Sequence, residues 1–165
     1  MNTIDQEQVK KVGELLKSSR YTVCLTGAGV STASGIPDFR TPGNGLWSKV
    51  NPIEVTSIQA FRDNPSRFYK FYRPRIEELQ RVSPNPAHKA LAKLEDAGYL
   101  QFLITQNIDN LHQRAGSKHI MEIHGNLNQA ICIRCGERIS SQELIKRIDE
   151  NKNGIPYCQC GGVLK

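Results

Sequence analysis

The stretch Gly27-Ala28-Gly29-Val30-Ser31-Thr32-Ala33-Ser34-Gly35-Ile36-Pro37-Asp38-Phe39-Arg40 (GAGVSTASGIPDFR) begins like the glycine turn of a dinucleotide-binding fold. It directly follows the β-rich run 21–26, so the turn lies at the carboxyl end of a predicted strand, where open α/β sheets bind their ligands. The usual fingerprint has its last glycine where this chain has Thr32. The stretch therefore predicts an α/β fold with a ligand loop that departs from the standard dinucleotide turn.

Two more short apolar runs follow, with helical sequence between them. Residues 100–105 and 119–123 are predicted strands, and the polar clusters Gln106-Asn107-Ile108-Asp109 and His124-Gly125-Asn126 come directly after them. Strands that alternate with helices form parallel sheets, whose carboxyl ends meet along one edge. We therefore expect three parallel strands with their polar clusters on one crevice.

Apolar residues at helical spacing predict the helices around these strands. One is expected over 4–18, opened by a capping box at Thr3-x-x-Gln6. Another begins at Asn64-Pro65, and Pro74 within it predicts a kink or a break. A third is expected over 86–97, closed by Gly98, and another before Gly116. The last is expected over 141–150, opened by Ser140-x-x-Glu143, and irregular structure or short helices are expected over 45–63.

Four of the five cysteines form two close pairs, Cys132/Cys135 and Cys158/Cys160, on either side of the last predicted helix. Two thiolate pairs brought together complete a tetrahedral zinc site, which leaves no coordination position free for chemistry. A redox dithiol pair and unligated thiols are the alternatives. Cys24 stands alone in an apolar run and is expected in the core. The pattern predicts a structural zinc module near the end of the chain.

Composition and charge limit the classes of protein to which the chain can belong. The net charge is +6, but the basic residues are scattered, so direct nucleic-acid binding is not expected. No apolar run approaches the roughly 20 residues that span a bilayer. The first twenty residues carry charges throughout and do not resemble a secretion signal. We therefore expect a cytoplasmic protein that makes no membrane contact.

The polar residues at the strand ends are candidates for catalysis. His124 follows the last strand, and a histidine titrates near neutral pH, which suits a base that removes a proton from a hydroxyl group. A lone histidine is usually structural, and the Asn107-x-Asp109 pattern also occurs in ordinary helix caps. The coincidence of a glycine loop, an amide-carboxylate pair and a histidine on successive strand ends favours a site. The remaining histidines are expected to be structural: His88, His112 and His119.

Four motifs of this chain keep the order that they have in one family. They are GAGVS-(3)-GIPDFR at 27–40, QNID at 106–109, HGN at 124–126 and the cysteine pairs at 132–160. In these motifs, which extend over most of the chain, the sequence resembles the sirtuins, NAD-dependent protein-lysine deacylases.

The resemblance implies a Rossmann-like NAD-binding domain over 1–125, with a helical insert at about 41–85, and a zinc-binding module over 126–165. NAD would lie in the cleft between the two. The family continues beyond the cysteine pairs with further strands, so the resemblance also implies an incomplete sheet with an unpaired edge and an uncovered apolar face. We expect the chain as given to bind NAD poorly and to be inactive or nearly so.

The resemblance also implies roles for individual residues. His124 would be the general base, and Asn107 and Asp109 would complete the catalytic set. Asp109, with Ile108, would hold the nicotinamide carboxamide, and Gln106 and Asn107 would reach the nicotinamide ribose. The loop residues that would contact NAD are Gly27, Ala28, Gly29, Thr32, Phe39 and Arg40, with Phe39 also screening the ribose from returning nicotinamide. The zinc ligands would be Cys132, Cys135, Cys158 and Cys160.

The implied reaction consumes NAD. The carbonyl oxygen of an acyl-lysine attacks the ribose as nicotinamide leaves, and free lysine and O-acyl-ADP-ribose are the products. Acetyl is the expected acyl group, although Tyr72 and Arg75 match a pattern that some sirtuins use for succinyl or malonyl groups. Two alternatives stay open: an NAD-dependent mono-ADP-ribosyltransferase of the same fold, and a non-catalytic zinc-ribbon module that binds protein or nucleic acid.

Overall fold

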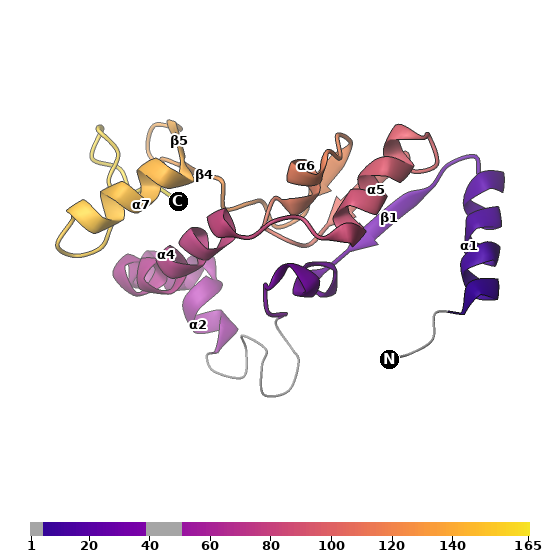
Figure 1. Cartoon of the computed structure of the whole chain (residues 1–165). Helices are drawn as coiled ribbons and strands as arrows, with labels where there is room; N and C mark the ends of the chain where they lie inside the picture. The colour runs from indigo at the N-terminus through magenta and orange to yellow at the C-terminus, as the bar shows by residue number, and fades with distance from the viewer. Residues whose placement is uncertain (1–4, 39–50) are drawn as a thin grey trace.

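Three parallel strands form the sheet that carries the strand-end clusters. The computed structural model describes residues 5–38 and 51–165, and the strands are β1 (Val23–Thr26), β2 (Phe102–Thr105) and β3 (Ile120–Glu122). Their spatial order is β1-β2-β3, with Leu25 beside Ile104 and Ile104 beside Met121 (Figure 1). The predicted α/β class with a parallel sheet is confirmed. Each strand is shorter than the apolar run that predicted it.

The two faces of this sheet differ in burial. Leu103 and Thr105 are buried on one face, where Thr26 also contacts the helix α6 (Leu111–Ala115). On the other face Leu25, Met121 and Ile123 are 63%, 53% and 52% exposed. Alternate residues of a strand point to opposite faces, so one face is covered and one apolar face is open, as expected. Cys24, expected in the core, is half-buried.

The first helix, α1 (Gln6–Ser18), begins one residue after its capping side chain, Asp5. The Asp5 carboxylate accepts hydrogen bonds from the backbone N–H groups of Glu7 and Gln8, at 3.0 and 3.2 Å. The predicted capping box at Thr3 is therefore wrong, because Asp5 stands at the position that reaches the free N–H groups. In Figure 1 the helix stands apart from the sheet. Its apolar stripe is exposed and consists of Val9, Val12 and Leu15.

Three helices follow the residues that are not described. They are α2 (Pro52–Thr56), α3 (Ile58–Asp63) and α4 (Pro65–Arg81). The Asn64 side chain caps α4 by accepting a hydrogen bond from the Arg67 N–H, as predicted. The helix continues through Pro74, so of the two predicted outcomes the break is wrong, whereas the kink stays a prediction. Tyr69 before the proline and Ile76 after it are buried in one core, and this packing holds both halves of the helix.

The first cysteine pair lies in the turn of a hairpin, and the second pair follows the helix after that hairpin. The hairpin strands β4 (Gln129–Ile131) and β5 (Arg138–Ser140) are antiparallel and were not predicted. Helix α7 (Ser141–Glu150) begins where predicted, with the Ser140 hydroxyl accepting from the Glu143 N–H. The last residues pair with the hairpin, where Ile131 and Lys165 exchange both backbone hydrogen bonds. We call residues 126–165 the cysteine module.

The main hydrophobic core joins α3 and α4 to the cysteine module. Phe61 and Tyr69 pack with Leu144, Ile148 and Leu164, all buried, and the Tyr69 hydroxyl donates a hydrogen bond to the Leu164 carbonyl. This packing joins α3 and α4 to the cysteine module. The domain boundary predicted between residues 125 and 126 stays a prediction.

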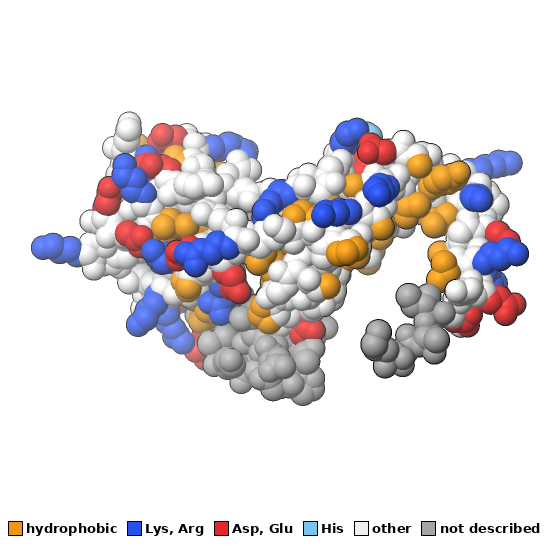
Figure 2. Space-filling view, in the orientation of Figure 1, with side chains coloured by type: hydrophobic (Ala, Val, Ile, Leu, Met, Phe, Trp, Pro, Cys, Tyr) orange, Lys and Arg blue, Asp and Glu red, His pale blue; other side chains and the backbone are white. Residues whose placement is uncertain are grey.

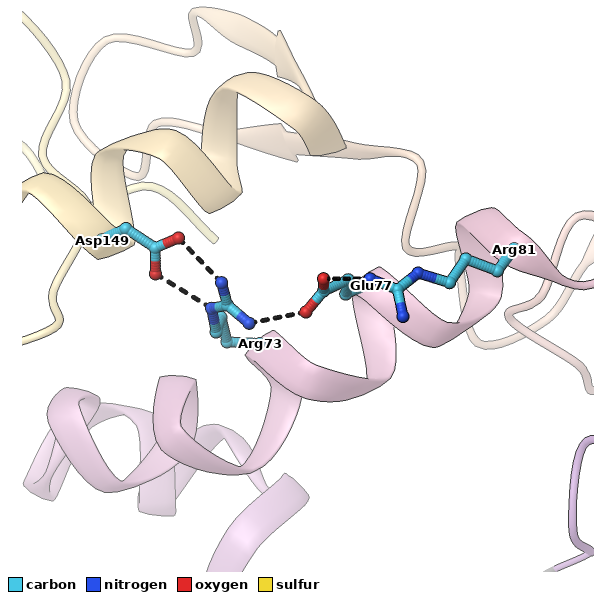
Figure 3. Close-up of polar contacts among 4 residues, drawn as sticks. All are labelled: Arg73, Glu77, Arg81 and Asp149. Atoms are coloured by element: carbon cyan, nitrogen blue, oxygen red, sulfur yellow. Dashed lines mark hydrogen bonds and ion pairs between the residues drawn. The ribbon is translucent and has the colours of Figure 1, made fainter.

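Ion pairs reinforce the same contact. Arg73 on α4 donates two hydrogen bonds to the Asp149 carboxylate on α7, at 2.9 and 2.8 Å. Figure 3 shows that Arg73 also contacts Glu77, which in turn binds Arg81 one turn further along α4. Helix α5 (Pro86–Asp96) leads back to the sheet, and Gly98 with φ 78° ends it, as predicted. Among the described helices none has the length and the apolar content needed to cross a membrane.

Candidate functional site

The glycine loop winds tightly after β1. Residues Ala28–Ser34 form a 3₁₀ helix, which Gly35 ends with φ 92°. Gly27 and Gly29 have room around them, since a Cβ at either position meets no other atom within 4 Å. Packing within the described chain therefore does not require glycine at these two positions. The free space beside Gly27 and Gly29 lies in the loop that directly follows β1.

Ser31 joins this loop to the end of β2. It is 1% exposed, and its hydroxyl donates to Asp109 Oδ2 at 2.6 Å. Asn107 Nδ2 donates to Ser31 Oγ and to the Gly27 carbonyl, both at 3.1 Å. The structure thus brings the predicted Asn107 and Asp109 together with the loop. The sequence analysis missed Ser31, whose only signal was a small hydroxyl residue between the two glycines and Gly35.

Asp109 is buried with both carboxylate oxygens hydrogen-bonded. Oδ2 accepts from Ser31, and Oδ1 accepts from the Leu111 backbone N–H at 2.9 Å. The next residue, Asn110, adopts φ 60°, a left-handed conformation that costs energy in a residue other than glycine. A carboxylate has four acceptor positions, so Asp109 keeps capacity for a further donor.

Two histidines lie directly behind this cluster. His88 is 0% exposed and His112 is 1% exposed, and their ring centroids are 4.8 Å apart. Burial lowers the pKa of His88, an effect that the Asp109 charge opposes. Burial, together with the neighbouring His88, lowers the pKa of His112 to about 4. Both rings are therefore neutral at pH 7, which agrees with the structural role predicted for them.

His124 is exposed at the end of β3. The turn that follows is fixed by Glu122, whose carboxylate accepts from Asn126 Nδ2 at 2.7 Å, and by Gly125 with φ 74°. The Leu127 N–H donates to the Ile108 carbonyl at 3.1 Å, which ties this turn to the end of β2. No side-chain hydrogen bond joins His124 to another described residue. The ring is free to receive a proton from a bound molecule.

The remaining strand-end candidates are more exposed. Gln106 donates its backbone N–H to the Thr26 carbonyl, and its side chain faces solvent. The exposed Thr32 hydroxyl donates to the Gly29 carbonyl at 2.9 Å, and Ala28 is half-buried. Phe39 and Arg40 lie outside the described residues.

Tyr72 and Arg75 lie on α4, away from this hydrogen-bond network. Tyr72 is half-buried, and its ring centroid is 4.5 Å from that of Phe68. The Arg75 guanidinium lies 3.5 Å over the Phe71 ring and donates to the Phe71 carbonyl. Its Nε is buried without a partner among the described residues, and burial lowers the pKa of Arg75.

The four paired cysteines converge on one point. Their Sγ atoms all lie within 4.8 Å of one another, with Cys132 and Cys160 at 3.5 Å and Cys135 and Cys158 at 3.6 Å. These separations are far too long for disulfide bonds, in which the sulfurs are about 2.05 Å apart. They match the edges of a tetrahedron with zinc–sulfur bonds of about 2.3 Å. Four thiolates without a fifth ligand suit a structural zinc ion.

The surroundings of Cys132 favour its thiolate form. Burial opposes ionisation of Cys132, but the backbone N–H groups of Cys135 and Arg134, together with the Cys160 and Cys135 side chains, lower its pKa to about 6. The pKa values of Cys135 and Cys158 are raised by hydrogen bonds with neighbouring side chains. The second pair has one residue between its cysteines, and Gly162 follows it closely. A Cβ at Gly162 would lie 2.6 Å from the Arg134 Cβ and 2.7 Å from the Cys132 sulfur. Glycine at this position therefore lets the chain after the second pair pass close to the first pair.

A separate hollow lies between α4 and α7. Its volume is about 240 Å³, and it shares no residue with the strand-end cluster. Its lining combines aliphatic side chains with amide and hydroxyl side chains and Arg114.

Comparisons with known proteins agree on one family. The Sir2 family model matches residues 27–165. An NAD-dependent protein deacetylase of Sulfurisphaera tokodaii is 49% identical over 156 residues, which are 94% of this chain and 61% of that protein. The NAD-dependent protein deacetylase 2 of Caldanaerobacter subterraneus is 46% identical, over 94% of this chain and 62% of its own length.

Solved structures show the same likeness. A Sir2 variant with a deacetylated p53 peptide and 3′-O-acetyl ADP-ribose superimposes with a TM-score of 0.88 at 43% identity, over 95% of this chain and 63% of that one. A complex of Sir2 with a p53 peptide and NAD⁺ gives a TM-score of 0.83 at 41% identity, over 95% and 62%. The present chain thus spans a little over three fifths of the length of these proteins.

Proposed function

This chain belongs to the Sir2 family, and from that premise we propose that it carries the catalytic strand ends and the zinc module of an NAD-dependent protein-lysine deacetylase. One observation supports this most directly. Ser31, Asn107 and Asp109 form a single hydrogen-bonded cluster at the ends of β1 and β2, and His124 follows the end of β3. A carboxylate, an amide and a base are what the cleavage of NAD requires.

The residues present fit NAD. The space beside Gly27 and Gly29 lets a phosphate approach the backbone of the loop. Asp109 keeps acceptor capacity for the NH₂ group of a carboxamide, with Ile108 beside it, and Asn107 and Gln106 lie next to it for the ribose. NAD supplies the ribose carbon that accepts the acyl oxygen. Ala28, Thr32, Phe39 and Arg40 are proposed contacts on the same loop.

His124 is the proposed general base. Its exposed ring takes the proton from a ribose hydroxyl, which makes that oxygen nucleophilic toward the acyl carbon. Asn107 and Asp109 orient the sugar and the carboxamide, because both side chains are held by Ser31 and by backbone groups. Water then completes the release of free lysine and O-acyl-ADP-ribose.

The proposed substrate is acetyl-lysine in proteins or peptides. Related Sir2 structures hold an acetylated peptide and a propionylated peptide. Tyr72 and Arg75 would favour succinyl or malonyl groups only if the Arg75 guanidinium left the Phe71 ring. We also propose a cytoplasmic location, where the reducing environment keeps the four thiols available for zinc.

A chimera tests the proposal. Residues 1–165 are fused to the C-terminal remainder of the Sulfurisphaera tokodaii relative and incubated with labelled NAD and an acetylated peptide. O-acetyl-ADP-ribose is the expected product, whereas the 165-residue chain alone gives little, because one face of its sheet is open. Label bound to protein would indicate an ADP-ribosyltransferase. A chimera that folds and binds zinc but forms neither product, beside an active relative, would contradict the proposal.

A further inference from the structure

His112 lies at the point where α6 meets the ends of two strands. Its Nε2 is 2.9 Å from Thr26 Oγ1 at the end of β1. The Thr26 hydroxyl donates to Thr105 Oγ1 at the end of β2, also at 2.9 Å. Thr105 Oγ1 in turn accepts from the Asn107 backbone N–H at 3.1 Å. A chain of hydrogen bonds therefore runs from the His112 ring to the backbone of Asn107.

The position of the His112 ring hydrogen follows from burial. Nδ1 is buried and has no partner among the described residues. A hydrogen on Nδ1 would be a buried donor without an acceptor, which is costlier than an unused lone pair. The hydrogen is therefore assigned to Nε2, which donates to Thr26. The Thr26 hydrogen then has Thr105 as its acceptor, so Thr105 Oγ1 accepts both from Thr26 and from the Asn107 N–H.

His88 repeats this arrangement on the other side of the cluster. The Asn85 backbone N–H donates to His88 Nδ1 at 3.3 Å, which leaves the hydrogen on Nε2, 3.4 Å from Ser31 Oγ. Ser31 then donates to Asp109. The two neighbouring rings, tilted by 59° to each other, thus support the two ends of the segment 107–109. The titratable groups that face His112 are His88 on α5 and Asp109 before α6.

We propose that His112 is a positioning residue, whose ring fixes the backbone of Asn107 through Thr26 and Thr105 and thereby places the 107–109 segment for the nicotinamide end of NAD. The reference to NAD rests on the proposed function. The positioning itself does not rest on it, because every hydrogen bond between His112 and Asn107 is internal to the protein. His112 acts through the two threonines and touches no reacting atom.

Amide hydrogen exchange tests the positioning without any cofactor. The chain is compared with His112→Phe, which keeps an aromatic ring beside His88 but removes the donor, and with His112→Gln, whose side-chain amide donates from a position near that of Nε2. Removing the donor is expected to lower the protection of the Asn107 amide about tenfold, the effect of one hydrogen bond. The Leu103 amide, bonded to the His119 carbonyl within the sheet, is the internal reference.

The glutamine variant is expected to recover most of the Asn107 protection. Equal losses at Asn107 and Leu103, or equal behaviour of the two variants, would overturn the positioning role. Should the phenylalanine variant not fold, ¹⁵N spectra of the unsubstituted chain decide. A neutral His112 ring protonated at Nε2 at pH 7 supports the proposal, and a ring protonated at Nδ1 overturns it. Failure of the chimera to turn over NAD leaves these readouts unchanged, so the two proposals fail separately.

Discussion

The strand-end cluster and the cysteine module are held together in different ways. The cluster depends on hydrogen bonds among buried polar groups, with Ser31 and Asp109 at its centre, on a sheet with one open apolar face. Figure 2 shows apolar side chains along β1 and on the side of α1 that faces the sheet. The cysteine module is closed by four sulfurs and by a core shared with α4. The region proposed for chemistry thus depends on polar contacts, whereas the other is closed by its own sulfurs and core.

This difference has a physical cause. A structural metal site needs only to satisfy its own ligands, so the same residues that bind the ion also close the fold. A site that binds a ligand must keep acceptors and space unused, as at Asp109 and Gly27, and this leaves it dependent on the surrounding scaffold. Removing a group from each region should therefore have effects of different kinds.

Zinc removal is expected to have the largest effect. Without the ion, the four sulfurs, which lie within 4.8 Å of one another, lose the partner that holds them together, so β4, β5 and α7 should lose their packing. Amide exchange before and after chelation measures this, with the Leu103 amide of the sheet as the control. Leu144 on α7 reports on the cysteine module. The contrast between the two regions would not hold if the Leu103 amide lost its protection from exchange to the same degree as the Leu144 amide.

Replacing His124 with alanine is expected to remove activity and leave structure intact. In the chimera described above, turnover should fall roughly 10²- to 10⁴-fold, the usual loss when a general base is removed. Zinc content and the unfolding temperature should not change, because the ring is exposed and makes no internal hydrogen bond. The comparison variant is His119→Ala, which lies directly before β3 and loses only a contact with Glu95, away from the strand ends. Near-normal turnover in the His124 variant would exclude the base role.

Acid should lower the stability of the folded chain through the buried histidines His88 and His112 behind the strand-end cluster. Below pH 6.5 the unfolded chain takes up a proton on His112, whereas the folded chain does so only near its lowered pKa of about 4. The contribution of His112 to the free energy of unfolding is therefore constant above pH 6.5 and is lost between pH 6.5 and 4. At pH 5 the loss is about 2 kcal/mol.

Urea unfolding followed by the sheet amides at pH 7 and pH 5 measures this loss, since probes in the sheet are separate from the zinc ligands. The His112→Gln variant is the control, and its stability should change less over the same range. Identical pH profiles for the two proteins would mean that His112 does not carry the effect.

A cap on α4 provides the smallest expected effect. Asn64→Ala removes the side-chain acceptor for the Arg67 N–H and should lower the free energy of unfolding by about 1 kcal/mol. Because α4 packs against the cysteine module, thermal unfolding followed by α7 probes should report this loss. Asn51→Ala, which removes the same kind of cap from the five-residue α2, is the matched control and should change stability less. A larger loss of unfolding free energy in the Asn51→Ala variant would contradict the prediction that α4 contributes more to stability than α2.

Local sequence signals determined the elements and most of the candidate site. Alternating strands and helices predicted the parallel sheet, and the caps at Asn64 and Ser140 were predicted correctly because a cap depends on neighbours within a few residues. Paired cysteines indicated a four-sulfur site for the same reason. The cap of α1 was assigned wrongly, since Asp5 and Thr3 both have suitable side chains and only the chain path distinguishes them.

Tertiary contacts decided the rest. Pro74 does not break α4, because buried residues on both sides of it hold the helix against the cysteine module. The buried contacts of Ser31, His88 and His112 behind the cluster had no local signal, since they join residues between 57 and 86 positions apart along the chain. The sequence by itself thus determined which residues could react and which could bind a metal. Only the folded chain decided which buried groups hold them in place, because long-range hydrogen bonds form between segments that no local pattern relates.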